Sequence, residues 1–334
     1  MGTVQFGMFD QLEHPGGGVP LHQLYRDRLG LLQRAEQAGF WGYHKSEHHM
    51  IPLDAAPSIN LFLAAAAQVT STIRICSLVH LLPFYHPLRL AEEICMLDHL
   101  SEGRFEFGFG KGISAPEHRL WGMDDAEADA RTDEALRLIL QALQTDGWLT
   151  FEGEFWQYRD VPIEQRPYQA PYPPLWRPGT LDTAARLGVS TMAGGPTAMV
   201  AAAVQRYREL RQPGVGGGHE PKIGAVRKYF VAATDGEAED RARAAWVAFT
   251  EHLSRLFRRF EMTPPNDPTL GGDFDRAMAV QAIVCGSPAK VREAVEELAA
   301  NGGTNYLVGQ FAWGDLGIDE VTRSFDLFVE HCMI

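Results

Sequence analysis

The chain has 334 residues, 45% of them hydrophobic and 22% charged, an ordinary globular composition that suits one large α/β barrel or two domains. Its net charge of -13 argues against nucleic acid and anionic membranes as partners. No apolar run could span a bilayer, and the first residues lack the features of a signal peptide. The cysteines have no CxxC spacing, which argues against zinc and for reduced thiols in a cytoplasm: Cys76, Cys95, Cys285 and Cys332.

The first third of the chain alternates apolar, β-rich segments with segments whose apolar residues recur at helical spacing. The predicted strands are residues 4–9, 40–43, 73–78 and 104–109. The predicted helices are residues 21–38, 59–69 and 88–100. Gly39 and Gly103 follow two of these helices, where glycine can adopt the left-handed conformation that ends a helix.

This alternation breaks at residues 151–174, which are rich in aromatic residues and prolines and have no helical period. We expect a hairpin-like excursion there. Predicted strands return at residues 175–176, 189–193, 222–234 and 304–311. Predicted helices lie before and between them, at residues 127–145, 180–187, 197–210, 238–260, 287–301 and 318–329.

Eight strands alternating with helices favour a (β/α)8 TIM barrel with a non-barrel excursion between strands four and five. No repeat or low-complexity linker divides the sequence, so we treat residues 1–334 as a single domain. A doubly wound open sheet is the alternative fold. The absence of G-x-G-x-x-G after the first strand weakens that alternative.

In a barrel, the chemistry lies at the carboxyl ends of the strands. Glu47-His48-His49 follows the second strand, and a histidine beside a carboxylate can exchange protons near neutral pH. His48 is therefore our candidate acid or base, with Glu47 orienting its ring; a pair of ordinary loop histidines is the plainer alternative. We expect no metal site, because His44 and His48 lie four residues apart in a strand-to-loop segment and not on a helix.

A second candidate site surrounds Lys111, at the end of strand four. Gly110 and Gly112 leave the backbone bare on both sides of this cation. Exposed N–H groups beside a positive charge suit a phosphate, although a tight turn explains the same glycines.

Two further segments add to this phosphate site. Thr180 begins the helix after strand five, preceded by Arg177 and Gly179, so a hydroxyl, a cation and a helix N-terminus would meet there. Arg131, at the start of the helix after strand four, could reach the same place. Taken alone, Thr180 is explained by a helix cap and Arg131 by a solvated surface charge. Their common place at one rim of the barrel favours a shared phosphate site.

Several stretches form a wider pattern: Glu47-His48-His49, Leu82-Pro83 with His86 to Arg89, Leu100 to Gly112, Trp176 to Gly188 and Gly286-Ser287-Pro288. Together they resemble the luciferase-like flavin monooxygenases, whose type member is the alpha subunit of bacterial luciferase. The resemblance implies a TIM barrel, usually dimeric, that receives reduced FMN from a separate flavin reductase. It also implies that dioxygen is used to oxidise a small-molecule substrate.

The resemblance implies residue roles as well. It gives the catalytic role to His48 and places a non-proline cis peptide bond, beneath the flavin ring, between Leu78 and Val79. It assigns the flavin phosphate contacts to Lys111, Arg131, Arg177 and Thr180.

The sequence departs from the luciferase alpha subunit in two ways. Gly110 stands where that subunit has its reactive cysteine, and Ile113 and Ser114 stand where it has bulky pocket residues. We therefore expect neither a long-chain aldehyde substrate nor light emission. Other members of the family suggest two alternatives, a deazaflavin-dependent oxidoreductase and a non-catalytic flavin-binding protein.

We also expect a homodimer. The helix at residues 59–69 carries four consecutive alanines, so small residues face both the barrel and its outer side. The outer side permits close helix approach, and we expect it to pair with a second copy together with the helix at residues 88–100.

Overall fold

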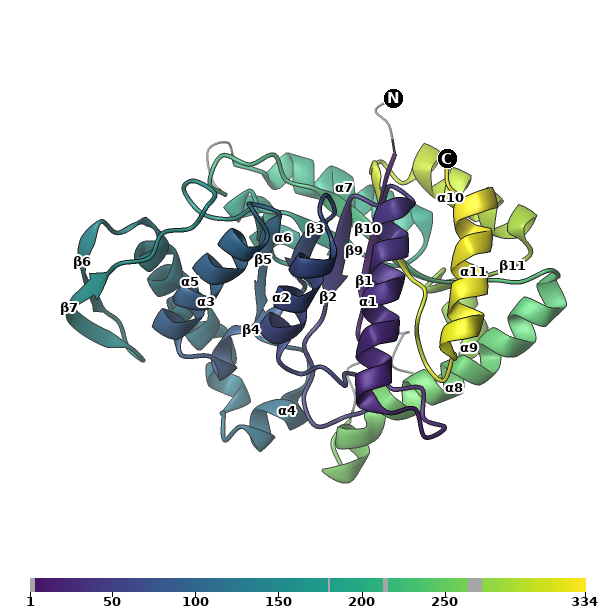
Figure 1. Cartoon of the computed structure of the whole chain (residues 1–334), viewed down its shortest axis with the longest axis horizontal. Coiled ribbons are helices and arrows are strands. Elements are labelled where there is room, and N and C mark those ends of the chain that lie inside the picture. Colours follow the sequence, from purple (N-terminus) through teal and green to yellow (C-terminus); the bar gives the residue numbers. More distant parts are fainter. Residues whose placement is uncertain (1–3, 180, 213–215, 264–271) are drawn as a thin grey trace.

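The computed structural model describes residues 4–179, 181–212, 216–263 and 272–334 (Figure 1). Its strands are β1 (Gln5–Asp10), β2 (Gly42–Lys45), β3 (Arg74–Ser77), β4 (His80–Leu81), β5 (Phe105–Gly110), β6 (Gly147–Glu152), β7 (Gln157–Ile163), β8 (Leu175–Trp176), β9 (Thr191–Ala193), β10 (Ile223–Val231), β11 (Ile283–Gly286) and β12 (Tyr306–Gln310). Its helices are α1 (Leu21–Gln37), α2 (Ile59–Val69), α3 (Pro87–Leu100), α4 (Ala115–Leu120), α5 (Ala128–Gln144), α6 (Leu181–Leu187), α7 (Thr197–Leu210), α8 (Asp235–Arg259), α9 (Phe274–Ala279), α10 (Pro288–Asn301) and α11 (Ile318–His331). All eight predicted strands are present, and the structure adds β4, β11, α4 and α9, which the sequence patterns did not reveal.

One mostly parallel, curled sheet organises the molecule. From β1 the pairing runs through β2 and β3 to β5, and β5 also pairs with β8. On its other side β1 pairs with β12, and β12 pairs with β10, which also contacts β9 and β11. A single parallel bridge joins Trp176 of β8 to Ser190, the residue before β9. The first and last of the eight predicted strands are therefore neighbours, unlike those of a doubly wound open sheet.

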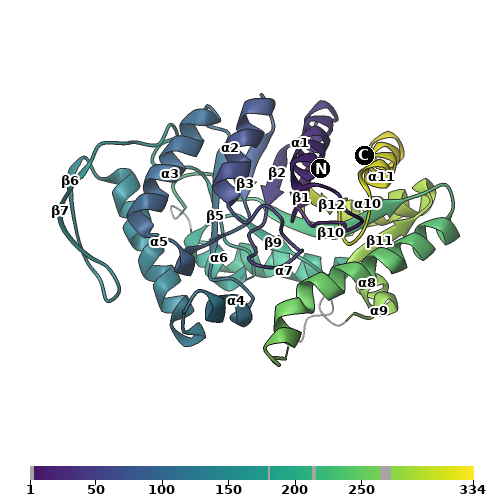
Figure 2. The same ribbon diagram turned by 60° about the horizontal axis from the view of Figure 1, so that its bottom comes forward.

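The helices cover the outside of this sheet. Figures 1 and 2 show α1, α2, α3 and α11 in a row along one side, with α6 and α7 on the other. Alternating residues of β1, Phe6 and Met8, are buried beneath the row. The Phe6 ring lies 6.1 Å from that of Phe40 and 6.0 Å from that of Phe328 on α11. This packing brings the two ends of the chain together.

The inside of the curled sheet is filled by side chains, among them the fully buried ring of Tyr306 on β12. A Cβ atom on Gly7 would lie 2.2 Å from the Tyr306 hydroxyl oxygen, so only glycine leaves room for this ring. The same hydroxyl lies 2.6 Å from His44 Nε2. Burial lowers the pKa of His44 to about 3, so the ring is neutral and belongs to the core. Among the described residues no cluster suited to a metal ion is present.

The segment between β5 and β8 leaves the sheet as an antiparallel hairpin of β6 and β7, seen at the left of Figure 1. Glu134 of α5 holds its turn, because its carboxylate accepts hydrogen bonds from the backbone N–H groups of Glu154, Phe155 and Trp156 at 2.8, 2.9 and 2.8 Å. Burial would raise the pKa of Glu134, but these three donors outweigh it and the pKa is lowered.

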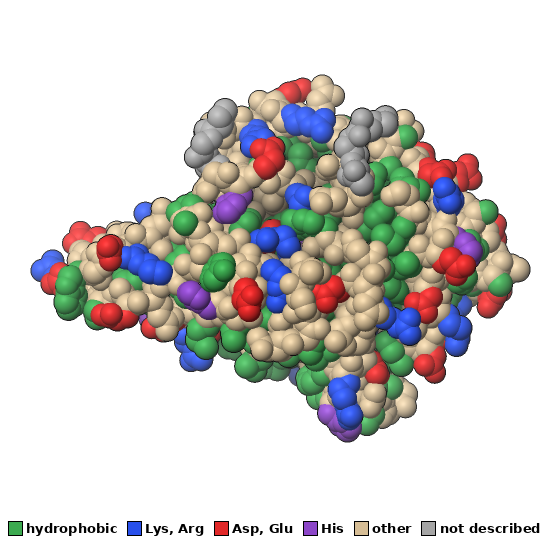
Figure 3. All heavy atoms as spheres, turned by 45° about the horizontal axis from the view of Figure 1, so that its top comes forward, with side chains coloured by type: hydrophobic (Ala, Val, Ile, Leu, Met, Phe, Trp, Pro, Cys, Tyr) green, Lys and Arg blue, Asp and Glu red, His purple; other side chains and the backbone are tan. Residues whose placement is uncertain are grey.

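The surface carries both signs of charge, and the cysteines form no disulfides. Acidic and basic side chains are mixed over the face that Figure 3 shows, with no continuous basic area there. All four cysteines are free and buried. No helix within the described ranges is long and apolar enough to cross a membrane.

Candidate active site

Three groups of predicted site residues lie at the carboxyl ends of β2, β5 and β8. Glu47 to His49 follow β2, Gly110 ends β5 and Arg177 follows β8. The chain connects these groups through Leu81 of β4, whose N–H donates to Glu47 Oε2 at 3.2 Å. The Leu81 side chain would also meet a Cβ atom on Gly112 at 3.3 Å. The histidine segment and the glycine-flanked lysine are thus parts of one site.

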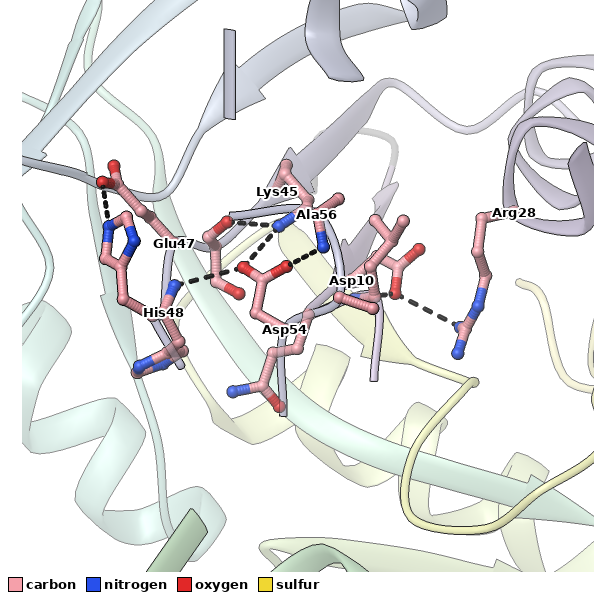
Figure 4. A network of polar contacts seen from close by, with 12 residues as sticks. Asp10, Arg28, Lys45, Glu47, His48, Asp54 and Ala56 are labelled. Carbon is pink, nitrogen blue, oxygen red and sulfur yellow. Dashed lines mark hydrogen bonds and ion pairs between the residues drawn. The ribbon is translucent and has the colours of Figure 1, made fainter. Parts of the chain in front are cut away.

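A buried ion pair fixes the backbone where β2 ends (Figure 4). Lys45 Nζ lies 2.6 Å from Asp54 Oδ2, and both side chains are fully buried. The same carboxylate accepts the backbone N–H of His48 at 3.1 Å and that of Ala56 at 2.9 Å. Burial raises the pKa of Asp54, and the ammonium of Lys45 opposes that rise. The position of His48 in the loop is therefore set by a carboxylate that the sequence analysis did not consider.

His48 and His49 have different carboxylate partners. His48 Nδ1 lies 3.1 Å from Oε1 of Glu117, which comes from α4. His49 Nε2 lies 2.8 Å from Oε1 of Glu47. The prediction that Glu47 orients His48 is therefore wrong. The Glu47 side chain lies on the same side of the chain as that of His49, two residues on, as in an extended segment where adjacent side chains point to opposite sides.

Glu47 and His49 belong to a packed group beneath the site. Glu47 Oε2 also accepts a hydrogen bond from the Tyr85 hydroxyl at 2.9 Å. The His49 ring meets the rings of Phe84 and Trp121 edge-on, with centroids 5.6 and 5.1 Å away. Burial raises the pKa of Glu47, against the effect of its hydrogen bonds from His49 and Tyr85. His49 is therefore held by one carboxylate and two aromatic rings.

The peptide bond between Leu78 and Val79 is cis, as the sequence resemblance implied. Glycines of β5 allow this segment to approach closely. A Cβ atom on Gly108 would lie 2.0 Å from the carbonyl oxygen of Ser77, and one on Gly110 would lie 2.9 Å from Val79 Cγ2. The same Cβ atom on Gly110 would lie 3.7 Å from Arg177 Nη1. The structure thus brings the cis bond, Gly110 and Arg177 together.

The predicted phosphate seat contains two cations and unforeseen carboxylates. Lys111 Nζ lies 2.7 Å from Asp129 Oδ2 in an exposed ion pair. Arg177 is buried, with its guanidinium carbon 5.4 Å from the centroid of the Phe109 ring. Burial lowers the pKa of Arg177, and the attraction of Asp133 and Asp129 opposes that effect. An anion at this seat would compete with these carboxylates.

The other predicted phosphate contacts do not all converge. Arg131 forms an ion pair with Glu127 at 2.9 Å, and its guanidinium lies 4.2 Å from the centroid of the Phe155 ring, on the hairpin side of α5. It lies two residues beyond Asp129, about 200° further round the helix, which is why it does not face Lys111. Gly179 has a φ of 81° and open space around its Cβ position. Thr180 lies outside the described residues.

These residues fit a flavin-like cofactor that carries a phosphate. Lys111 and Arg177 supply charge for its phosphate, the bare backbone at Gly110 and Gly179 leaves space, and the segment from Leu78 to Val79 lies against β5 beside them. Such a cofactor would be held by these groups, although Asp129 reduces the net positive charge of the seat.

The sequence analysis missed Glu117, Asp54 and His118. His118 Nε2 lies 2.6 Å from the Lys111 carbonyl oxygen and its Nδ1 lies 2.6 Å from Asp125 Oδ1, so it joins the lysine loop to the turn that precedes α5. A usable signal existed for α4: Ser114 and Glu117 have the S-x-x-E spacing of a helix N-terminus. The Ser114 hydroxyl does accept the Glu117 N–H, at 3.4 Å.

A family model described as luciferase-like monooxygenase matches residues 4–305. The chain belongs to this family. A protein of Sinorhizobium fredii described as uncharacterised is 34% identical over 324 residues, covering 95% of this chain and 92% of its own length. The oxygenase component of the flavin-dependent trigonelline monooxygenase from Acinetobacter baylyi is 31% identical over 175 residues, which cover 52% of this chain and 48% of that protein.

Solved structures agree with the fold. The monooxygenase RslO1 from Streptomyces bottropensis matches with a TM-score of 0.81 and 26% identity, over 98% of both chains. The oxygenating constituent of 3,6-diketocamphane monooxygenase from Pseudomonas putida, in complex with FMN, matches with a TM-score of 0.80 and 20% identity over 99% of this chain and 98% of its own. An F420-dependent secondary alcohol dehydrogenase shares the fold with a TM-score of 0.73 and 18% identity, over 99% and 98%.

Proposed function

We propose that this protein is an FMN-dependent monooxygenase that uses reduced FMN and dioxygen to oxidise a small organic substrate. The observation that carries the proposal is the meeting of Arg177, Gly110 and the Leu78–Val79 bond at one end of the curled sheet, beside Lys111. Membership of the luciferase-like monooxygenase family and the FMN bound by a protein of the same fold support it. The curled sheet is, in this proposal, a (β/α)8 barrel whose mouth holds the flavin.

The roles of the residues follow from their positions. Lys111 and Arg177 bind the phosphate, with Thr180 as a further expected contact. Leu78 and Val79 support the flavin ring, and Gly110 leaves space beside it. His48 Nε2 makes no hydrogen bond within the described part of the chain, so it is available to give or take a proton at the reacting centre. Bound reduced FMN supplies the electrons that dioxygen activation requires.

The phosphate seat gives the test of this proposal. A charge-assisted contact is worth about 1.5–3 kcal/mol, so Lys111→Ala is expected to weaken FMN binding about ten-fold or more. Riboflavin, which lacks the phosphate, should bind wild type and variant with the same affinity. Fluorescence titration under reducing and oxidising conditions measures both. Equal FMN affinity in wild type, Lys111→Ala and Arg177→Ala would refute the seat.

A deazaflavin-dependent oxidoreductase is the second candidate. The dehydrogenase with the same fold, described as F420-dependent, favours it, and the carboxylates beside Lys111 make the seat less suited to a phosphate dianion. Parallel titrations with reduced FMN and reduced deazaflavin separate the two candidates. Oxygen-dependent product formation then separates a monooxygenase from a non-catalytic flavin-binding protein.

The biological setting belongs to the same proposal. A seat whose lysine is exposed and paired with a carboxylate suits a cofactor that arrives reduced from a separate flavin reductase. We also propose a homodimer through α2 and α3, and a cytoplasmic location, where reduced flavin and free thiols persist.

A further inference from the structure

Two adjacent histidines, each with its own buried carboxylate, follow β2. The side chain of Glu117 is 2% exposed and that of His48 is 12% exposed. The corresponding values for Glu47 and His49 are 1% and 11%. The two pairs are thus matched in burial and in chemistry, but they use opposite ring nitrogens: Nδ1 in His48 and Nε2 in His49.

We propose that Glu117 is a positioning residue for His48, which fixes the hydrogen on Nδ1 so that Nε2 alone exchanges the proton in the reaction. An ionised carboxylate can only accept a hydrogen bond, so the nitrogen facing Glu117 must carry the hydrogen. The other nitrogen of the neutral ring is then a free acceptor, and in the charged ring it is a donor. The inference rests on the proposed function for the reaction itself.

His48 is held at two points, one on its backbone and one on its ring. Its backbone N–H donates to Asp54, whose carboxylate is paired with Lys45, and its Nδ1 contacts Glu117. Glu117 is held in turn by the first turn of α4, where its N–H donates to the Ser114 hydroxyl. When the backbone of a histidine and one nitrogen of its ring are both fixed, the other nitrogen points in one direction. Acid–base catalysis requires this fixed orientation.

The charges around His48 support this role. Burial favours the neutral imidazole, but the attraction and hydrogen bond of Glu117 from α4, with help from Asp54, outweigh burial and the repulsion of Lys45, so the pKa of His48 is raised. The charged ring therefore persists to a higher pH than that of an ordinary histidine. His48 can then act as a proton donor near neutral pH as well as an acceptor.

NMR spectroscopy of the flavin-free protein, with its histidine side chains isotopically labelled, tests the proposal without a measurement of activity. The His48→Asn variant identifies the His48 signals. In wild type, at pH values above the raised pKa of His48, we expect the neutral ring to carry its hydrogen on Nδ1. In Glu117→Gln we expect the proton affinity of His48 to fall about ten-fold or more, the usual effect of losing a close opposite charge. Glu117→Asp keeps the charge but shortens the reach, and should lose the fixed tautomer with a smaller change in affinity.

Glu47→Gln is the matched control, because it removes the carboxylate of the neighbouring histidine. It is expected to change the signals of His49 and leave those of His48 in place. Unchanged tautomer and proton affinity of His48 in folded Glu117→Gln or Glu117→Asp would overturn the proposal, as would an equal change in Glu47→Gln. Since no flavin is present, these results stand apart from the FMN titrations that test the proposed function.

With flavin and substrate, the pH profile gives a second readout. In the plot of turnover against pH, one limb reflects the titration of His48. Loss of Glu117 should move this limb toward lower pH, by the same shift in pKa that the NMR titration measures. A purely structural role would lower turnover at all pH values and leave the limb in place.

Discussion

At the residue scale, Asp129 is a competitor for the cation that a phosphate would use. Its carboxylate lies 2.7 Å from Lys111 Nζ, and its charge also acts on Arg177. A flavin phosphate must replace this contact or share it. An exposed ion pair is worth about 0–1 kcal/mol, so the competition is modest but measurable.

Asp129→Asn is therefore expected to increase the affinity for FMN by up to about five-fold, the equivalent of about 1 kcal/mol. Glu127→Gln is the control, because Glu127 pairs with Arg131 on the hairpin side of α5 and not with Lys111. Titration at two salt concentrations adds a check, since the gain should shrink at high salt. A weaker affinity in Asp129→Asn would show that Asp129 orders the lysine and does not compete.

His48→Ala should lower turnover about a hundred-fold or more while FMN affinity is retained, because general acid–base help contributes about 10²–10⁴ in rate and the phosphate seat lies elsewhere. Single-turnover oxidation of the preformed reduced FMN complex measures the loss. His49→Ala is the comparison, and its effect should appear in stability, since its ring packs against Phe84 and Trp121. A large kinetic loss in His49→Ala alone would reverse the assignment.

How far the sequence could predict the site is clearest at His48 and Glu117. A strand end followed by Glu47-His48-His49 is a local pattern, and it located the histidines correctly. The carboxylate partner could not be found in this way, because Glu117 is 69 residues away and only the packing of α4 brings it to His48. Glu47, the neighbour of His48 in sequence, pairs with His49 instead, because adjacent side chains of an extended segment point to opposite sides.

At the element scale, the hairpin of β6 and β7 depends on one carboxylate. Three consecutive N–H groups of its turn donate to Glu134. The pKa of Glu134 is lowered in the folded protein, so its stabilising contribution is present above its ordinary pKa of 4.5 and is lost as the pH falls through the lowered value.

Glu134→Ala is expected to expose the amides of Glu154, Phe155 and Trp156 to faster hydrogen exchange near neutral pH, with little change in the curled sheet. Acidification of the wild type through the lowered pKa should produce the same local opening once the intrinsic pH dependence of exchange is removed. Asp133→Asn on the same helix is the control, because the charge of Asp133 acts on Arg177. Equal protection in wild type and Glu134→Ala would mean that strand pairing alone holds the turn.

Long, periodic elements were predicted well, and short ones were not. The strands with alternating or continuous apolar residues and the helices with a clear apolar face all appear near their predicted bounds. The helices α4 and α9 have only six residues each, too few for a helical period to show. The strand β11 has four residues, and it pairs with β10 from a part of the sequence without alternation.

At the scale of the whole molecule, the outer face of α2 and α3 carries exposed apolar side chains. Leu61 is 74% exposed and Met96 is 54% exposed. A hydrogen bond of 2.6 Å between Asn60 and Glu93 joins the two helices. We expect Leu61→Asp to convert a dimer to a monomer, measured by light scattering at micromolar concentration.

Val247→Asp is the control for that experiment, because Val247 is 64% exposed on α8, outside the expected interface. It should leave the oligomeric state unchanged. A wild-type monomer at micromolar concentration would contradict the expected dimer, as would a dimer that survives in Leu61→Asp with unchanged affinity.

The pairing of β1 with β12 has a consequence for synthesis on the ribosome. Gln5 pairs with Tyr306, so one edge of the first strand cannot pair until almost the whole chain has been synthesised. Until then its hydrogen-bonding groups and the buried faces of Phe6 and Met8 have no native partner on that side. Such late, long-range closure slows folding and leaves an apolar edge open to other chains. Nascent chains that end before residue 306 should therefore bind chaperones strongly, and release should coincide with the emergence of β12.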